Sequence, residues 1–202
     1  MRTSKPIATI SFNSKIFLVQ KLTELQRAKK ISFWVFMPHL PEDDEGGKKD
    51  HCHLYVVPSK LIQTDDLREE LKEFDPVNPS LPLGCLPFDV SKFDHWYMYC
   101  LHDKRYLAAK GQTRRFHYTH EQFVSCDDDY LLFLSKQIDL TALTPYSDML
   151  DAIDRGLTFG EYFSRGFIPI QQIGNYEKAW KLLTANETFR NGRPDHPNEP
   201  TD

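Results

Sequence analysis

Two histidines separated by one residue, His51 and His53, are the first side chains in this sequence that could act together on one ligand. Residues 51–57 are largely apolar and predict a β-strand. Residues two apart in a strand face the same side, so both imidazoles project together while Cys52 points into the opposite layer. Two imidazoles placed in this way can share one divalent cation. The competing interpretation is an exposed histidine pair on an edge strand.

A second group of candidate ligands precedes this strand. His39 follows another predicted strand, Ile31–Met37, and Glu42 comes three residues later. If the two strands form a hairpin, their facing ends bring His39 and Glu42 close to the histidine pair. Three imidazoles and a carboxylate suit Mn²⁺ well, and Mg²⁺ or Zn²⁺ less selectively, while a purely structural zinc site is the competing interpretation. Two further carboxylates are rivals of Glu42: Asp43 and Asp44.

A tyrosine on a predicted helix is the candidate nucleophile. The helix that begins at Asp94 has an apolar side, which carries Tyr97, and a polar side, which carries Tyr99 and His102. A phenol has a pKa of about 10, so at pH 7 it needs help from a metal or from a base such as His102. A metal would also offset the charge that builds on a phosphate under attack, and the product would be a phosphotyrosine. The competing interpretation, which Tyr99 taken alone favours, is an ordinary surface tyrosine.

The elements that position these side chains alternate along the first two thirds of the chain. Their order, β-α-β-β-α-β-α, predicts an α+β fold with a central antiparallel β-sheet covered by helices. Beyond Thr144, glycines separate short helical patterns, which predict a small helical appendage. The expected division is a domain at 1–143, a helical region at 144–189 and a disordered polar tail at 190–202. The predicted strands are 5–12, 31–37, 51–57 and 86–90, and the predicted helices are 15–30, 65–74, one from Asp94, and 127–138.

Charge and composition restrict the class of protein. The net charge is −4, which argues mildly against a nucleic-acid binder, although a basic stretch can still hold phosphates. The basic stretch spans residues 104–115, and three aromatic residues interleaved with it could stack bases: Tyr106, Phe116 and Tyr118. The simpler interpretation of the basic residues is a solvated face. The basic residues of this stretch are Lys104, Arg105, Lys110, Arg114 and Arg115.

The cysteines and the hydropathy indicate the compartment. The four cysteines form no CxxC pair, which disfavours a thiolate metal site and a disulfide framework and fits a reducing cytoplasm. No run of roughly 18 apolar residues exists, and the N-terminus does not have the pattern of a signal peptide. The sequence therefore predicts a cytoplasmic protein that does not span a membrane.

Taken in order, the three motifs resemble those of the HUH endonucleases, and most closely the plasmid rolling-circle replication initiators of the streptococcal type. The resemblance covers roughly residues 5 to 135. Cys52 stands where the family has a bulky apolar residue, and His102 stands where many relatives have lysine. The matching stretches are Met37-Pro38-His39 with Glu42, then His51-Cys52-His53-Leu54-Tyr55-Val56-Val57, and then Tyr97-Met98-Tyr99-Cys100-Leu101-His102.

This resemblance implies a function. Tyr99 would be the nucleophile, and Mn²⁺ or Mg²⁺ would be bound by His39, Glu42, His51 and His53. The protein would nick and rejoin single-stranded DNA at an origin hairpin through a 5′-phosphotyrosine, for rolling-circle replication of a plasmid or phage. Its expected partners are single-stranded DNA, the host helicase and polymerase, and further copies of itself. No Walker A motif is present, which disfavours the fused helicase of viral relatives.

Other functions remain open from the sequence. The chain could be a non-catalytic DNA-binding regulator with a structural metal, a metallo-hydrolase that uses activated water, or a mobilisation relaxase or transposase of the same superfamily. One observation separates the tyrosine mechanism from the regulator, because a nucleophilic Tyr99 must lie in line with the metal cleft and the Tyr99 of a regulator need not. A metallo-hydrolase would leave Tyr99 idle and would form no covalent adduct.

Overall fold

The chain forms two compact units. The computed structural model describes residues 1–40, 50–72, 83–88, 92–114, 116–166, 168 and 170–187. Unit 1 holds residues 1–101 and 118–139, and unit 2 holds residues 102–117 together with the chain from Leu140 onward. Residues 102–117 therefore belong to unit 2, although the chain on both sides of them belongs to unit 1. The single boundary predicted at 143/144 does not include this excursion of the chain. The predicted tail, residues 190–202, lies outside the described residues.

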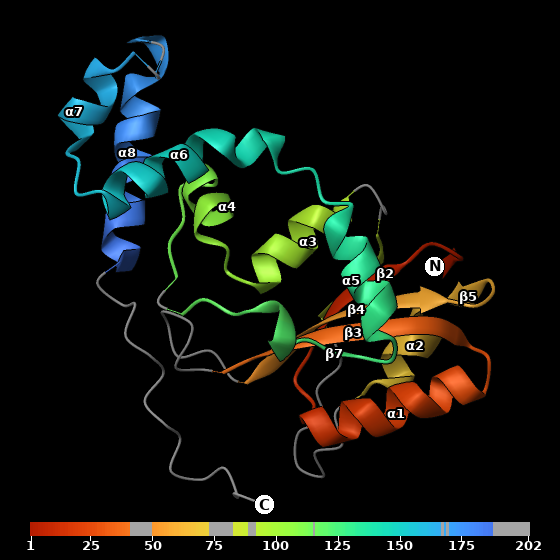
Figure 1. Cartoon of the computed structure of the whole chain (residues 1–202). Coiled ribbons are helices and arrows are strands. Elements are labelled where there is room, and N and C mark those ends of the chain that lie inside the picture. The colour runs from red at the N-terminus through yellow and green to blue at the C-terminus, as the bar shows by residue number, and fades with distance from the viewer. Residues whose placement is uncertain are drawn as a thin grey trace, which may run out of the picture. The chain divides into compact units, whose positions relative to one another are not determined.

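Unit 1 is built on antiparallel strands. A five-stranded sheet has the order β6-β2-β4-β3-β7, and β1 and β5 pair in a separate two-stranded sheet. The two longest strands, β3 and β4, lie side by side, so they form the hairpin that the sequence predicts (Figure 1). The strands are β1 (Arg2–Thr3), β2 (Ile7–Ser11), β3 (Ile31–His39), β4 (His51–Pro58), β5 (Ile62–Gln63), β6 (Leu83–Pro87) and β7 (Val124–Ser125).

Four α-helices cover the two faces of the five-stranded sheet. Side-chain oxygens cap two of them, since Ser14 accepts from the Phe17 N–H and Asp127 accepts from the Tyr130 N–H. Figure 1 shows α1 and α2 on one side of the sheet and α3 and α5 on the other. The α+β class with a helix-covered antiparallel sheet is therefore confirmed. These helices are α1 (Lys15–Arg27), α2 (Thr64–Glu70), α3 (Phe93–Cys100) and α5 (Asp128–Lys136).

The strand alternation gives the two faces different side chains. On the α1 side, Leu54 and Val56 of β4 pack with α1 and α2 in a mainly aliphatic core, which also contains the rings of Trp34 and Phe36 and is called the aliphatic core below. On the α3 side, the Tyr55 ring contacts Phe93 and Trp96 of α3 at centroid distances of 5.3 and 5.4 Å. The side chains of β4 thus divide between two cores, because successive residues point to opposite faces.

Unit 2 is helical. Ala108 of α4 packs with Met149, Trp180 and Leu183 in a separate apolar cluster. Three of its helices lie where helical patterns are predicted beyond Thr144, and α4 joins them from the segment 102–117. The helices of unit 2 are α4 (Lys104–Ala109), α6 (Thr144–Asp154), α7 (Phe159–Ser164) and α8 (Ile173–Glu187). None of the helices described in either unit has the length and apolar character needed to cross a bilayer.

Candidate metal centre

The register of the β3–β4 hairpin brings three histidines to one place. His39 is directly opposite His51, and His53, two residues further along β4, faces the same side of the sheet. The predicted approach of His39 to the histidine pair is therefore confirmed. All three side chains are buried, with 1 %, 6 % and 7 % of their surface exposed, so the interpretation as an exposed edge-strand pair is wrong. The helix α3 covers this end of the hairpin, since Tyr99 packs on His53.

The spacing of the three imidazoles suits one metal ion. One ring nitrogen from each histidine lies within 4.8 Å of the other two. The ring centroids are 5.4 Å apart for His39 and His51, 4.6 Å for His39 and His53, and 5.0 Å for His51 and His53. A tetrahedral ion with metal–nitrogen bonds of 2.0–2.1 Å requires nitrogens about 3.3 Å apart, so small side-chain rotations would close the site. The three histidines can thus hold a divalent cation.

His39 is oriented by its surroundings. Its Nε2 lies 2.8 Å from the Cys100 carbonyl oxygen at the end of α3. Because a carbonyl only accepts, Nε2 carries the proton, and the buried Nδ1 has the lone pair for a metal. The ring of Tyr118 stacks on the His39 ring with centroids 4.4 Å apart and planes within 3°. The Tyr118 N–H in turn donates to the Leu101 carbonyl over 2.9 Å.

Tyr99 lies beside this centre. Its ring packs edge-to-face on the His53 ring, with centroids 5.4 Å apart and an interplanar angle of 87°. The side chain is half-buried, so its phenol is neither a free surface group nor part of the core. The Tyr99 ring therefore lies against one of the three candidate metal ligands of unit 1.

Tyr97, two residues earlier, has a different environment. It is 7 % exposed and stacks on Phe123 with ring centroids 5.1 Å apart. Its hydroxyl lies 2.7 Å from Nδ1 of His120. Burial raises the pKa of Tyr97, which disfavours the phenolate. The predicted helix phase, with Tyr97 in the core and Tyr99 outside it, is confirmed.

The position expected for His102 is wrong. The sequence places it on the polar side of the Tyr99 helix, but α3 ends at Cys100, and His102 has a φ of 50° and is 1 % exposed. Asp103 caps the next helix by accepting from the N–H groups of Arg105 and Tyr106, and this cap ends the first helix early. The His102 Nδ1 donates to the Phe116 carbonyl over 2.9 Å.

The remaining predicted ligands and contacts are only partly placed. Lys110 is exposed, with its ammonium 5.6 Å above the Tyr106 ring. The Arg105 guanidinium instead forms an ion pair with the Asp103 carboxylate, with a nitrogen–oxygen distance of 2.8 Å. The hydrogen bond to Asp103 raises the pKa of Arg105. Lys104 and Arg114 are half-buried in unit 2. The residues that lie outside the described part of the chain are Glu42, Asp43, Asp44 and Arg115.

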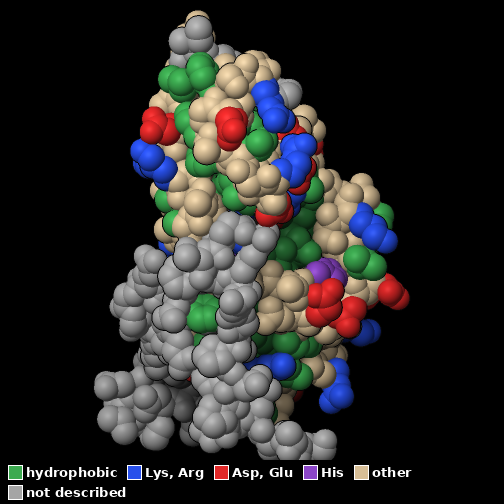
Figure 2. Space-filling model, turned by 60° about the vertical axis from the view of Figure 1, so that its left-hand side comes forward, with side chains coloured by type: hydrophobic (Ala, Val, Ile, Leu, Met, Phe, Trp, Pro, Cys, Tyr) green, Lys and Arg blue, Asp and Glu red, His purple; other side chains and the backbone are tan. Residues whose placement is uncertain are grey.

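The visible surface gives no strong electrostatic signal for nucleic acid. Figure 2 shows Lys and Arg interspersed with Asp and Glu over the described part of this face, without one continuous basic band. Tyr118, which the sequence offered as a base-stacking ring, is 9 % exposed and stacks on His39 instead.

Sequence reasoning missed two groups that orient His39, the Cys100 carbonyl and the Tyr118 ring. A carbonyl carries no side-chain signal, and Tyr118 has no motif spacing to the histidines. Together the centre offers three nitrogen ligands, a phenol in contact with one of them, and a carbonyl that fixes a tautomer. Neither the models of known protein families nor the curated proteins include a match to this chain.

Proposed function

We propose that this protein cleaves and rejoins single-stranded DNA with Tyr99 as the nucleophile and a divalent metal held by His39, His51 and His53. One observation carries the proposal, namely the contact of a half-buried tyrosine ring with a cluster of three buried histidines. A core tyrosine next to a structural zinc site has no need of the partial exposure that Tyr99 has. The order of the three motifs supports an HUH endonuclease of the rolling-circle initiator type.

In this proposal the Tyr99 oxygen attacks the scissile phosphorus, and the bond between phosphorus and the 3′ oxygen breaks. The leaving 3′ oxygen takes up a proton, so the products are a 5′-phosphotyrosine and a free 3′-hydroxyl, and the reverse reaction rejoins the strand. The bound cation, Mn²⁺ or Mg²⁺, supplies charge stabilisation for the phosphate oxygens. The phenol would give up its proton to water as it attacks, because His102 is buried and does not lie on the Tyr99 helix as the sequence predicts.

The chain's own residues would prepare this reaction. The Cys100 carbonyl keeps Nδ1 of His39 available as a ligand, and Cys100 directly follows Tyr99 on α3. The last turn of α3 would thus orient the ligand His39 through the Cys100 carbonyl and also carry the nucleophile Tyr99. This arrangement would fix their mutual geometry before substrate binds. A carboxylate from Glu42, Asp43 or Asp44 is the proposed fourth ligand.

The proposed substrate is a single-stranded origin hairpin. The phosphate of a DNA strand can reach a covered site only when the complementary strand is absent. Single strands bind through local stacking and phosphate contacts. Host replication proteins and a homo-oligomer are the proposed partners in rolling-circle replication of a plasmid or phage.

The test is a covalent-adduct assay. The protein is incubated with end-labelled single-stranded hairpins and Mn²⁺, and denaturing gels are examined for a protein–DNA band. Wild type should form the band, Tyr99→Phe should form none, and Tyr97→Phe is the matched control that should still form it. Mass spectrometry then locates the nucleotide. A nucleotide on Tyr97, or full cleavage by Tyr99→Phe, would reject the proposal.

A non-catalytic regulator with a structural metal is the second candidate, favoured by the deep burial of the three histidines. Structural zinc sites are closed and stabilise the fold outright. This candidate predicts that metal removal unfolds unit 1 and that no adduct forms with any hairpin.

A further inference from the structure

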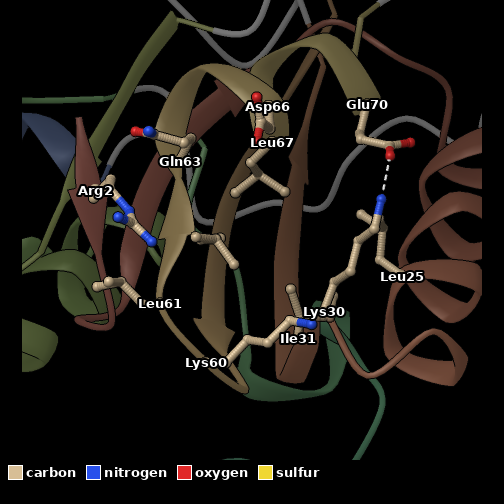
Figure 3. Close-up of a pocket in the computed structure, with 11 residues that line it drawn as sticks. Arg2, Leu25, Lys30, Ile31, Lys60, Leu61, Gln63, Asp66, Leu67 and Glu70 are labelled. Atoms are coloured by element: carbon tan, nitrogen blue, oxygen red, sulfur yellow. Dashed lines mark hydrogen bonds and ion pairs between the residues drawn. The ribbon is translucent and has the colours of Figure 1, made fainter.

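A pocket of unit 1 lies far from the metal centre. It has a volume of about 320 Å³ and is formed by β1, the end of α1, β5 and α2 (Figure 3). It includes Ile31, the first residue of β3, whereas His39 is the last residue of that strand. Eight strand steps separate the two ends, or about 26 Å at 3.3 Å per residue. The pocket is therefore a separate feature from the metal centre.

The floor of the pocket is aliphatic and firmly held. Leu25, Ile31 and Leu67 are 3 %, 1 % and 4 % exposed and belong to the aliphatic core of unit 1. Leu61, at the rim, is 51 % exposed. The floor is already shielded, so a ligand's aliphatic group would mainly cover Leu61, and covering aliphatic surface is favourable by about 25 cal/mol per Å².

The charges around the floor are not balanced. Glu70 is held by the ammonium groups of Lys21 at 2.6 Å and Lys30 at 2.5 Å, so its negative charge is already compensated. Figure 3 shows the side chains of Arg2 and Lys60 extending toward the floor. Within the described part of the chain, neither of these two cations forms an ion pair, and Asp66 is the remaining carboxylate of the lining. The lining thus has a surplus of positive charge beside an apolar floor.

The chemistry of the lining selects among anions. None of the lining residues is aromatic, so the pocket has no platform on which a nucleobase could stack. Arg2 offers a planar fork that matches a carboxylate, and Lys60 offers a second positive charge. We propose that this pocket binds an acidic peptide segment of a partner protein, with a leucine-sized side chain on the floor and neighbouring carboxylates on Arg2 and Lys60.

The proposal is tested by NMR with methyl-labelled full-length protein. The probe is an eight-residue peptide with two central leucines flanked by aspartates, and the expected result is a saturable shift of the Ile31, Ile62 and Leu67 methyl signals. Lys60→Gln and Arg2→Gln should each weaken binding by about threefold to fivefold, as for other partly exposed ion pairs. Leu61→Ser should also weaken it, and Lys136→Gln, an exposed lysine on α5, is the matched control that should not.

Three outcomes would overturn the proposal. They are the absence of shifts in the pocket methyls, equal binding of a peptide in which asparagines replace the aspartates, and shifts of the same methyls by an octathymidylate in place of the peptide. The assay contains no metal and measures no cleavage, so it is independent of the proposed nuclease function. The His51→Ala/His53→Ala protein should bind the peptide as wild type does.

Discussion

The two faces of β4 use the same strand for different purposes. Cys52, Leu54 and Val56 face α1 and α2 and are 4 %, 0 % and 0 % exposed. His51 and His53 point to the other face, where the imidazoles meet His39. Burial, with the nearby Asp50 carboxylate, raises the pKa of the Cys52 thiol to about 12, so this residue behaves as a small apolar group. One face packs wholly into the aliphatic core, and the other carries the histidine rings beside the aromatic contacts of Tyr55.

This difference shows how a buried polar cluster is supported. A buried imidazole without a hydrogen bond or a metal is destabilising, whereas the aliphatic face contributes stability directly. The aliphatic face can therefore hold the sheet in place while the histidine face is used for binding. The comparison predicts that changes on the histidine face alter function and that changes on the aliphatic face alter stability.

The largest effect is expected from removing two metal ligands. The double change His51→Ala/His53→Ala should abolish Mn²⁺ binding and nicking, because one imidazole cannot hold the ion alone. The fold should remain, because the aliphatic core does not include these rings. Calorimetric titration with Mn²⁺, the adduct assay and circular dichroism check the three parts. Full nicking by this variant in the presence of EDTA would show that the histidines hold no catalytic metal.

The reverse effect is expected on the opposite face. Leu54→Ala should lower the free energy of unfolding by about 2–5 kcal/mol, because it leaves a cavity in the core between β4 and α1. The molecules that remain folded should bind Mn²⁺ with nearly wild-type affinity. Urea denaturation measures the first quantity, and titration at low temperature measures the second. A large loss of Mn²⁺ affinity with unchanged stability would contradict the division between the faces.

A smaller effect is expected at the ring that supports His39. Tyr118→Leu should weaken Mn²⁺ binding by about tenfold, since loss of groups that orient a ligand typically costs 10–100-fold. Tyr118→Phe keeps the stacked ring and should restore the affinity. The readout is the Mn²⁺ dissociation constant. Equal affinities for all three proteins would show that stacking does not position His39.

The smallest effect is expected at Tyr97. Tyr97→Phe removes the hydrogen bond to His120 and should lower the free energy of unfolding by about 1 kcal/mol. Nicking should persist, since the hydroxyl lies in the core and not at the metal centre. Thermal denaturation and the adduct assay, run on the same preparation, check both expectations. Loss of the adduct with unchanged stability would point to a direct role of the Tyr97 hydroxyl.

Much of the candidate site follows from local periodicity. The alternation of β4 places His51 and His53 on one face, and the helical period separates Tyr97 from Tyr99. The hairpin inference also brings His39 to the pair, because antiparallel neighbours along the chain pair end to end. Periodicity did not give the end of α3, since the cap at Asp103 competes with helix continuation, and His102 was misplaced for that reason.

The sequence by itself determined the strand and helix phases, and with them the residue types at each face, because these depend on neighbours only a few positions away. Tertiary structure alone decided that the Cys100 carbonyl, 61 residues from His39, fixes that ring. It also decided that Tyr118 stacks on His39 and that segment 102–117 packs with the C-terminal helices. These contacts join distant parts of the chain, and backbone carbonyls and ring faces leave no spacing pattern from which such pairings could be predicted.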